Sequence, residues 1–186
     1  MTAILTDPPA SEPVTLAEAK AHLRVDAADD DTLIGDLIAA ARRHVEIATG
    51  RALIAQGWRI IREDMKAAGL LRLEPQPILS VDAVTLRRAD GTASVLASDR
   101  YVVDLATARL RMLASGEPLA GSQVEVDVTA GYGSGASDVP APLRQAVLML
   151  AAHWYQHREA ALADPPEPVA LGLASLVRPF RLTRVA

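Results

Sequence analysis

The chain has 186 residues and a formal net charge of −4, with half of its residues hydrophobic and 23% charged. This length and composition predict a globular protein with one core, with or without an appendage, and no apolar run reaches the roughly 18 residues that span a bilayer. The absence of cysteine excludes disulfides, thiol catalysis and thiolate metal sites. The negative net charge and the scattered arginines argue against a surface that holds nucleic acid by charge.

The N-terminal stretch MTAILTDPPASEP contains neither a basic region nor an apolar one. We therefore expect no signal peptide and synthesis in the cytoplasm. After this stretch, Thr15 and Glu18 have the spacing of a capping box, in which the threonine hydroxyl accepts the Glu18 N–H and the carboxylate accepts the Thr15 N–H. This pattern predicts a first helix over about residues 15–24.

A second helix is predicted over about residues 31–49. One of three aspartates is expected to cap its start, and Gly50 is expected to end it. The three are Asp29, Asp30 and Asp31. Apolar residues at helical spacing form its predicted stripe, and these are Leu33, Ile34, Leu37, Ile38, Ala41, Val45 and Ala48. Leu33, Leu37 and Val45 are expected to be buried, whereas the opposite face carries Asp36, Arg42, Arg43 and Glu46.

Between about residues 57 and 130 the period of apolar residues changes to two, which is typical of β-strands. Seven short segments show it: WRIIRED, GLLRLEP, ILSVDAVTLRR, TASVLAS, RYVVDL, ARLRML and QVEVDVT. Asp90-Gly91 and Ser115-Gly116 are turn patterns between them. Because no helix separates these strands, they are predicted to pair antiparallel.

A third helix is predicted over about residues 141–160. Its apolar face contains Leu143, Val147, Leu150, Ala151 and Trp154, and the helix is apolar almost all round between Ala146 and Ala152. We expect such a helix to be covered on several sides, by its own domain or by a neighbouring subunit. The sequence ADPPEP cannot continue it.

These elements together predict an α+β protein. It would have an N-terminal helix pair, a small antiparallel β region, a long C-terminal helix and an extended C-terminal arm. We expect one domain over residues 1–163 and the arm over residues 164–186.

The stretch AGYGSGASDVPAP, residues 130–142, lies between a strand and a helix, as a nucleotide-binding loop does. A dinucleotide fingerprint requires G-x-G-x-x-G leading directly into a helix of a βαβ unit. Here the third glycine is Gly135, the helix cannot start before Pro140, and no second strand follows. A Walker loop would require Lys-Ser or Lys-Thr after its last glycine. We therefore predict a turn and no nucleotide.

His153 and His157 are four residues apart on the third helix, which is a spacing of zinc ligands. The residues between them lack the glutamate of H-E-x-x-H, and no third ligand is evident. We expect no metal, no cofactor and no catalytic residue. The alternative is a small metal- or nucleotide-dependent enzyme that uses the histidine pair or the glycine loop.

Five stretches in order resemble the head-tail connector (adaptor) proteins of tailed phages and of the gene transfer agents derived from them. They are PVTLAEAKAHLRVD, DDDTLIGDLIAAARRHVEIATGRAL, VTAGYG, VPAPLRQAVLMLAAHWYQHRE and the terminal LxxLVRPFR. The resemblance covers the N-terminal helices, the end of the β region, the third helix and the tail, and is weakest over residues 56–122.

This resemblance implies a structural virion protein that forms a homo-oligomeric ring, twelve-fold like the portal on which it docks. The ring would lie in the neck of a phage or a phage-like particle, assembled in the bacterial cytoplasm, and join the DNA-filled head to the tail. The implied partners are the portal, neighbouring copies of the chain and a tail-side neck protein (stopper or terminator), with DNA passing through the channel without specific binding. An alternative is a different neck protein, such as a tail terminator.

The segment from Val169 onward follows a proline break, carries three arginines and no acid, and contains the only phenylalanine. Arginine and aromatic side chains dominate many interfaces. We therefore predict an arm that is mobile in the free subunit and orders on the portal. Its predicted contact residues are Leu173, Leu176, Val177, Arg178, Phe180, Arg181 and Arg184. The alternative is that it packs back on the third helix of its own chain.

Overall fold

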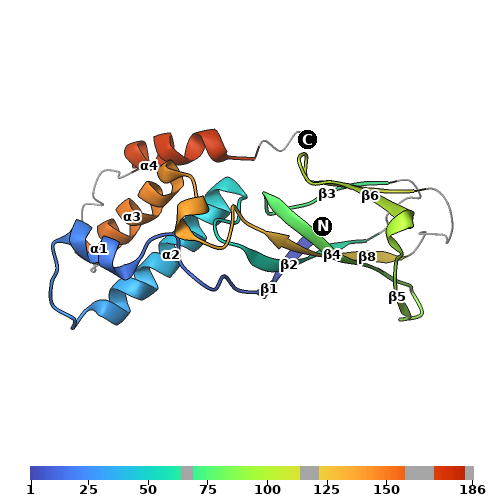
Figure 1. Ribbon diagram of the computed structural model, residues 1–186, viewed down its shortest axis with the longest axis horizontal. Coiled ribbons are helices and arrows are strands. Elements are labelled where there is room, and N and C mark those ends of the chain that lie inside the picture. The colour runs from blue at the N-terminus through green and yellow to red at the C-terminus, as the bar shows by residue number, and fades with distance from the viewer. Residues whose placement is uncertain (64–68, 114–121, 158–169, 183–186) are drawn as a thin grey trace, which may run out of the picture. The chain divides into compact units, whose positions relative to one another are not determined.

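The structure is a computed structural model that describes residues 1–63, 69–113, 122–157 and 170–182. It is an α+β protein of helices and antiparallel sheets, as the sequence predicted. The chain divides into two compact units (Figure 1). The sheet unit consists of Met1–Ala10 and Ala55–Tyr132, and the helical unit consists of Ser11–Ile54 and Gly133–Ala186. Each unit buries its own apolar residues, whereas the length alone favoured one core.

The helical unit contains four helices in the described part of the chain: α1 (Leu16–Leu23), α2 (Asp31–Thr49), α3 (Ala141–Gln156) and α4 (Ala170–Val177). In this unit α2 packs on α3, α1 contacts both, and α4 lies on α3 and α2 (Figure 1). None of the helices in the described residues is long and apolar enough to cross a bilayer.

The capping box of α1 has formed as predicted. The Thr15 hydroxyl accepts the Glu18 N–H at 3.2 Å, and Glu18 Oε2 accepts the Thr15 N–H at 2.8 Å. The helix ends at Arg24, whose left-handed backbone (φ 58°) returns its N–H to the last turn.

The start of α2 is held differently from the prediction. Asp30 is the N-cap residue, but its side chain does not bond to the helix N–H groups. Its Oδ2 instead accepts the Tyr155 hydroxyl of α3 at 2.5 Å, and Asp31 pairs with Lys20 of α1 at 2.5 Å. The aspartates therefore tie α2 to both neighbouring helices. At the other end, Gly50 adopts φ 74° and terminates α2 as expected.

The buried face of α2 is narrower than the apolar stripe in its sequence. Ile34, Ile38, Ala41 and Val45 are buried, but Leu33 is 37% exposed and Leu37 is only half-buried, so the prediction of a core position was wrong for Leu33. Successive residues turn by about 100° around a helix, so Leu33 points well away from the row that Ile34 begins.

Glu46 was predicted on the solvent side of α2 and is instead buried, with 4% exposure. Its Oε1 accepts the Leu53 N–H at 2.9 Å, and its Oε2 accepts Arg42 Nη1 at 3.0 Å. Arg42 also donates to Glu12 at 2.7 Å. The carboxylate can be buried because both its oxygens have donors.

The third helix begins as predicted at Ala141 but ends at Gln156, before the predicted end at about residue 160, because His157 has a non-helical backbone and is the C-cap residue. The predicted face is buried at Leu143, Val147, Leu150 and Ala151, with Trp154 half-buried. Three helices pack on α3, namely α1, α2 and α4, so it is covered on several sides within its own unit.

The sheet unit contains two antiparallel sheets in the described residues. The larger has the order β1-β2-β8-β4-β5, with β1 (Thr2–Asp7), β2 (Gln56–Arg62), β8 (Gln123–Ala130), β4 (Ile78–Arg87) and β5 (Ala93–Val95). The smaller has the order β3-β7-β6, with β3 (Leu70–Arg72), β7 (Arg109–Met112) and β6 (Tyr101–Asp104). Each of the seven predicted segments contains one strand, whereas β1 was not predicted.

The larger sheet has an apolar face and a charged one. Trp58, Ile60, Val126 and Val84 are buried on the apolar face. On the other face, Arg59 of β2 pairs with Asp127 of β8 at 2.7 Å, and Arg87 of β4 pairs with Glu125 of β8 at 2.7 Å. Such cross-strand pairs help to set the register of the central strands. The Asp90-Gly91 turn forms as predicted, with Gly91 at φ 87°, while Ser115-Gly116 lies outside the described residues.

Candidate functional site

The glycine-rich turn is occupied by an acidic side chain of its own. Asp138 Oδ2 accepts the Gly135 N–H at 3.0 Å, and a Cβ added at Gly133 would collide with the Asp138 carboxylate. The glycines therefore make room for a carboxylate. A phosphate at the same amide would be repelled by that negative charge, which supports the prediction of a turn without a nucleotide.

His153 of α3 and His157, the C-cap residue of that helix, lie side by side, with ring centroids 4.4 Å apart. His157 Nδ1 is 2.9 Å from the His153 carbonyl oxygen, so one ring nitrogen is engaged with the backbone. Among the residues that the structure describes, no group of three or more His, Cys, Asp or Glu side chains is arranged to hold a metal ion. The pair thus lacks the further ligands that a zinc site requires.

The C-terminal segment offers the more distinctive arrangement. Helix α4 lies on α3 and α2, and the 3₁₀ turn η3 (Arg178–Phe180) follows it and contacts it. Arg51 Nε donates to the Phe180 carbonyl oxygen at 2.7 Å, and the Leu182 N–H donates to the Thr49 carbonyl oxygen at 2.9 Å. Both bonds attach the segment to the end of α2.

Glycines at two places allow the segment to approach closely. A Cβ added at Gly50 would lie 3.1 Å from Leu182 Cδ1, and one added at Gly172 would lie 3.3 Å from Met149 Cε. The described part of the predicted arm is therefore helical and packs back on α3 and α2 of its own chain, in agreement with the alternative to a mobile arm.

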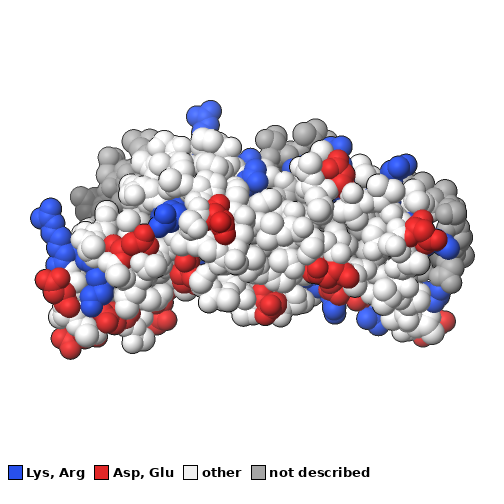
Figure 2. All heavy atoms as spheres, in the orientation of Figure 1, with Lys and Arg blue, Asp and Glu red and all other residues white. Residues whose placement is uncertain are grey.

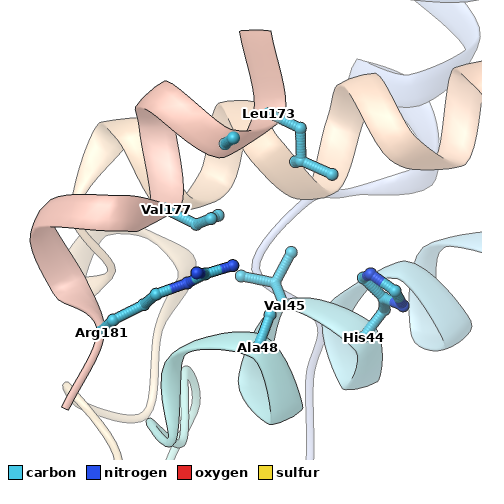
Figure 3. A pocket seen from close by; sticks show the side chains of 7 residues that line it. His44, Val45, Ala48, Leu173, Val177 and Arg181 are labelled. Carbon is cyan, nitrogen blue, oxygen red and sulfur yellow. The ribbon is translucent and has the colours of Figure 1, made fainter. Parts of the chain in front are cut away.

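A pocket of about 210 Å³ opens between α2 and α4. Its lining is mostly apolar, and consists of His44, Val45, Ala48, Leu173, Ala174, Val177 and Arg181. Figure 3 shows Val45 and Val177 pointing toward each other, with the Arg181 side chain reaching over Val45 and His44 at the other end. The His44 ring meets the Trp154 ring edge to face, with centroids 5.9 Å apart.

The predicted contact residues divide by exposure. Val177 is buried at 4%, Leu173, Leu176 and Phe180 are half-buried, and Arg178 and Arg181 are exposed. Arg184 lies outside the described residues. The segment thus packs its apolar side chains against its own subunit and leaves two arginines exposed, of which Arg181 also lines the pocket. Arginine beside a partly open apolar pocket suits a partner with acidic and apolar side chains.

Sequence reasoning missed the residues that receive this segment. Thr49 and Arg51 lie at the end of a predicted helix. Nothing in the local sequence there indicates contacts with Phe180 and Leu182, which are far away in the chain. The pattern that bore on it was the LxxLVRPFR stretch, in which four apolar residues have helical spacing: Leu173, Leu176, Val177 and Phe180.

The family model for phage gp6-like head-tail connector proteins matches residues 13–90. The chain is also 30% identical to a chain in a structure of the neck of an empty GTA particle with C6 symmetry, with a TM-score of 0.81 and coverage of 100% of this chain and 98% of that one. The chain belongs to the family of phage gp6-like head-tail connector proteins.

Two further solved structures agree with this assignment. A chain in the virion of a native gene transfer agent (GTA) particle has 30% identity, a TM-score of 0.81 and the same coverage. A chain in the neck of a native GTA particle with C12 symmetry has 30% identity and a TM-score of 0.72, over 98% of this chain and 97% of that one. No curated protein is significantly similar to the chain. Since the family and these neighbours are structural components of particles, the chain is a structural protein and not an enzyme.

Proposed function

We propose that this chain is the ring-forming head-tail connector in the neck of a gene transfer agent or phage-like particle. The observation that carries the proposal is similarity along the whole chain, at 30% identity, to a protein in GTA necks. Symmetric necks contain several equivalent copies, and an identical subunit repeated around an axis requires head-to-tail contacts. The ring would join the DNA-filled head to the tail.

The proposed ring leaves a channel through which DNA passes without specific binding. The net charge of −4 per copy gives the ring a negative total. On the face seen in Figure 2, charged side chains are scattered among uncharged ones, and arginines and lysines do not gather into a continuous patch. A surface of this kind lacks the concentrated cations that hold phosphates, so DNA can move past it.

Direct imaging of particles tests the location. Cryo-electron microscopy of particles carrying this chain should show it as a ring on the portal, between head and tail. A ring on the tail side that does not touch the portal would make the chain a different neck protein, such as a tail terminator. Absence of the chain from the particles would overturn the proposal.

The proposed portal contact is made by the arm, residues 164–186, with Arg178 and Arg181 as its exposed charges. The hydrogen bonds that join Phe180 to Arg51 and Leu182 to Thr49 support docking with the arm held in place on its own subunit. A segment ordered beforehand loses less conformational entropy on binding. Each contact would be weak, but a closed ring engages many at once.

Charge reversal separates docking from folding. Arg178→Glu with Arg181→Glu should leave the melting temperature near that of the unmodified chain, because both side chains are exposed, and should weaken portal pull-down at least about tenfold. Arg111→Glu, an exposed position on β7, is the matched control. Portal binding equal to that of the control would overturn the docking role. Deletion from Leu171 onward is a less specific test, because it also exposes the buried Val45 and so changes the packing of the helical unit.

A further inference from the structure

Strand β1 lies at the edge of the larger sheet and has few of the features that prevent an edge strand from pairing with another chain. All six of its residues are exposed, and in the described part of the chain its hydrogen-bonded neighbour is β2 alone. Residues 2–6 carry no charge, and Ile4 and Leu5 are 47% and 39% exposed. Natural edge strands usually carry lysine, proline or a covering loop, because a bare edge pairs with other chains. The edge of β1 therefore has the character of a contact surface.

The opposite edge of the same sheet is also partly open. Strand β5 pairs with β4 only from Thr85 to Arg87. The preceding part of β4, from Leu79 to Ala83, has no strand on that side among the described residues. Leu79 is 42% exposed there. This open stretch is about as long as β1.

A single row of side chains connects the two edges. Leu5 of β1 lies opposite Trp58 of β2, Trp58 lies opposite Val128 of β8, and Val128 lies opposite Val81 of β4. Directly opposite residues point to the same face of an antiparallel sheet. The row is thus apolar throughout, and it ends with Leu5 at one edge and Val81 at the other. A second copy that placed its Leu5 beside Val81 would continue the row.

The strand directions agree with such a continuation. From β1 through β2 and β8 to β4 every pairing is antiparallel, so β1 and β4 run in opposite directions. A second copy in the same orientation would therefore bring its β1 antiparallel to β4. A contact between two different edges is head to tail, the type that closes into a ring.

We propose that β1 of one copy adds to the Leu79–Ala83 edge of β4 in the next copy, so that neighbouring subunits share a sheet. This proposal rests on the ring of the proposed function. Irregular pairings flank Ser80 and Val81 in β4, and such bulges keep the regular contact short. A short contact is weak in an isolated pair of subunits and is strengthened when the ring closes.

Paired cysteines test this contact directly, because the chain has no cysteine of its own. Opposite residues of antiparallel strands lie close enough for a disulfide. Particles carrying Leu5→Cys with Val81→Cys should, after oxidation and denaturation without reductant, give a ladder of multimers that thiols collapse to monomer. Leu5→Cys or Val81→Cys alone should give no ladder. Leu5→Cys with Ile47→Cys, which uses a position 70% exposed in the helical unit, should give none either.

A second pair of variants tests assembly without cross-linking. Leu5→Lys places a charge on the edge of β1 and should reduce incorporation into necks at least tenfold, with the melting temperature nearly unchanged. Val95→Lys is the control, since Val95 is 72% exposed on β5 and outside the proposed contact. It should incorporate normally.

The outcomes separate this inference from the proposed function. If the unmodified chain is absent from necks, the proposed function fails. If the unmodified chain is present but the Leu5/Val81 cysteine pair gives no ladder, or if Leu5→Lys incorporates as well as Val95→Lys, only the shared sheet is overturned.

Discussion

Arg144 Nη2 of α3 lies 2.5 Å from Oε1 of Glu18, the carboxylate that closes the capping box of α1. The Nε of the same arginine donates to the Pro13 carbonyl oxygen at 2.9 Å. One side chain therefore holds the start of α1, and the chain leading into it, against a helix more than a hundred residues later in the sequence.

The first prediction concerns acid stability. Hydrogen bonds from the Thr15 backbone and hydroxyl lower the pKa of Glu18, and the charge of Arg144 lowers it further, against an opposing effect of burial. A carboxyl whose pKa is lower in the folded state stabilises the fold above its ordinary pKa, and this stabilisation is lost as the pH falls through the lowered value. Glu18→Gln should therefore lower the melting temperature at pH 7, and the difference should shrink below about pH 4.

Thermal melts of both proteins over this pH range measure the effect. Asp36→Asn, an exposed carboxylate on α2, should not show the same convergence. A Glu18→Gln difference that stays constant from neutral to acid pH would mean that the charge of Glu18 contributes nothing to stability.

The second prediction concerns the two faces of α2. Ile38 is 2% exposed and Leu33 is 37% exposed. Ile38→Ala should destabilise the protein by about 2 to 5 kcal/mol, as for other buried aliphatic residues, whereas Leu33→Ala should cost about 0.5 kcal/mol. Chemical denaturation measures both. Equal losses would show that Leu33 contributes to the core as much as Ile38.

The third prediction concerns the buried carboxylate of α2. Glu46→Ala removes the acceptor of the Leu53 N–H and leaves Arg42 without one of its two carboxylates. Loss of one partner from a buried ion pair costs about 3 kcal/mol or more. Arg43→Ala should cost less than about 1 kcal/mol, because that side chain is largely exposed and 3.8 Å from Glu46. If denaturation gives similar losses for Arg43→Ala and Glu46→Ala, burial of the carboxylate has no special role.

The fourth prediction is that assembly does not depend on a catalytic or metal-binding side chain. His153→Ala, His157→Ala and Ser134→Ala, the last in the glycine-rich turn of residues 130–142, should each leave the yield of particles near normal. A chelator such as EDTA should leave the melting temperature unchanged. The physical reason is the incomplete ligand set around the histidines in the described residues. A loss of several orders of magnitude in yield from one of these variants, with folding intact, would contradict it.

Some of the candidate site could be anticipated and some could not. The arm was recognisable as a separate segment because prolines precede it and its composition changes. The place where the arm packs could not be predicted, because the hydrogen bond from Arg51 to Phe180 joins residues 129 positions apart. Strand β1 was missed for a similar reason. Its short sequence lacks an alternating pattern, and it is a strand because β2 pairs with it.

By itself, the sequence determined the local features of this protein: the capping box at Thr15, the end of α2 at Gly50 and the seven strands of alternating residues. These depend on hydrogen bonds and side-chain periods within a few residues. Only the tertiary structure decided that Glu46 is buried while Leu33 is exposed, that α4 packs on α2, and that Leu5 and Val81 end one row across the sheet. Such features depend on which distant segments come into contact, and a local pattern carries no information about the partner it will meet.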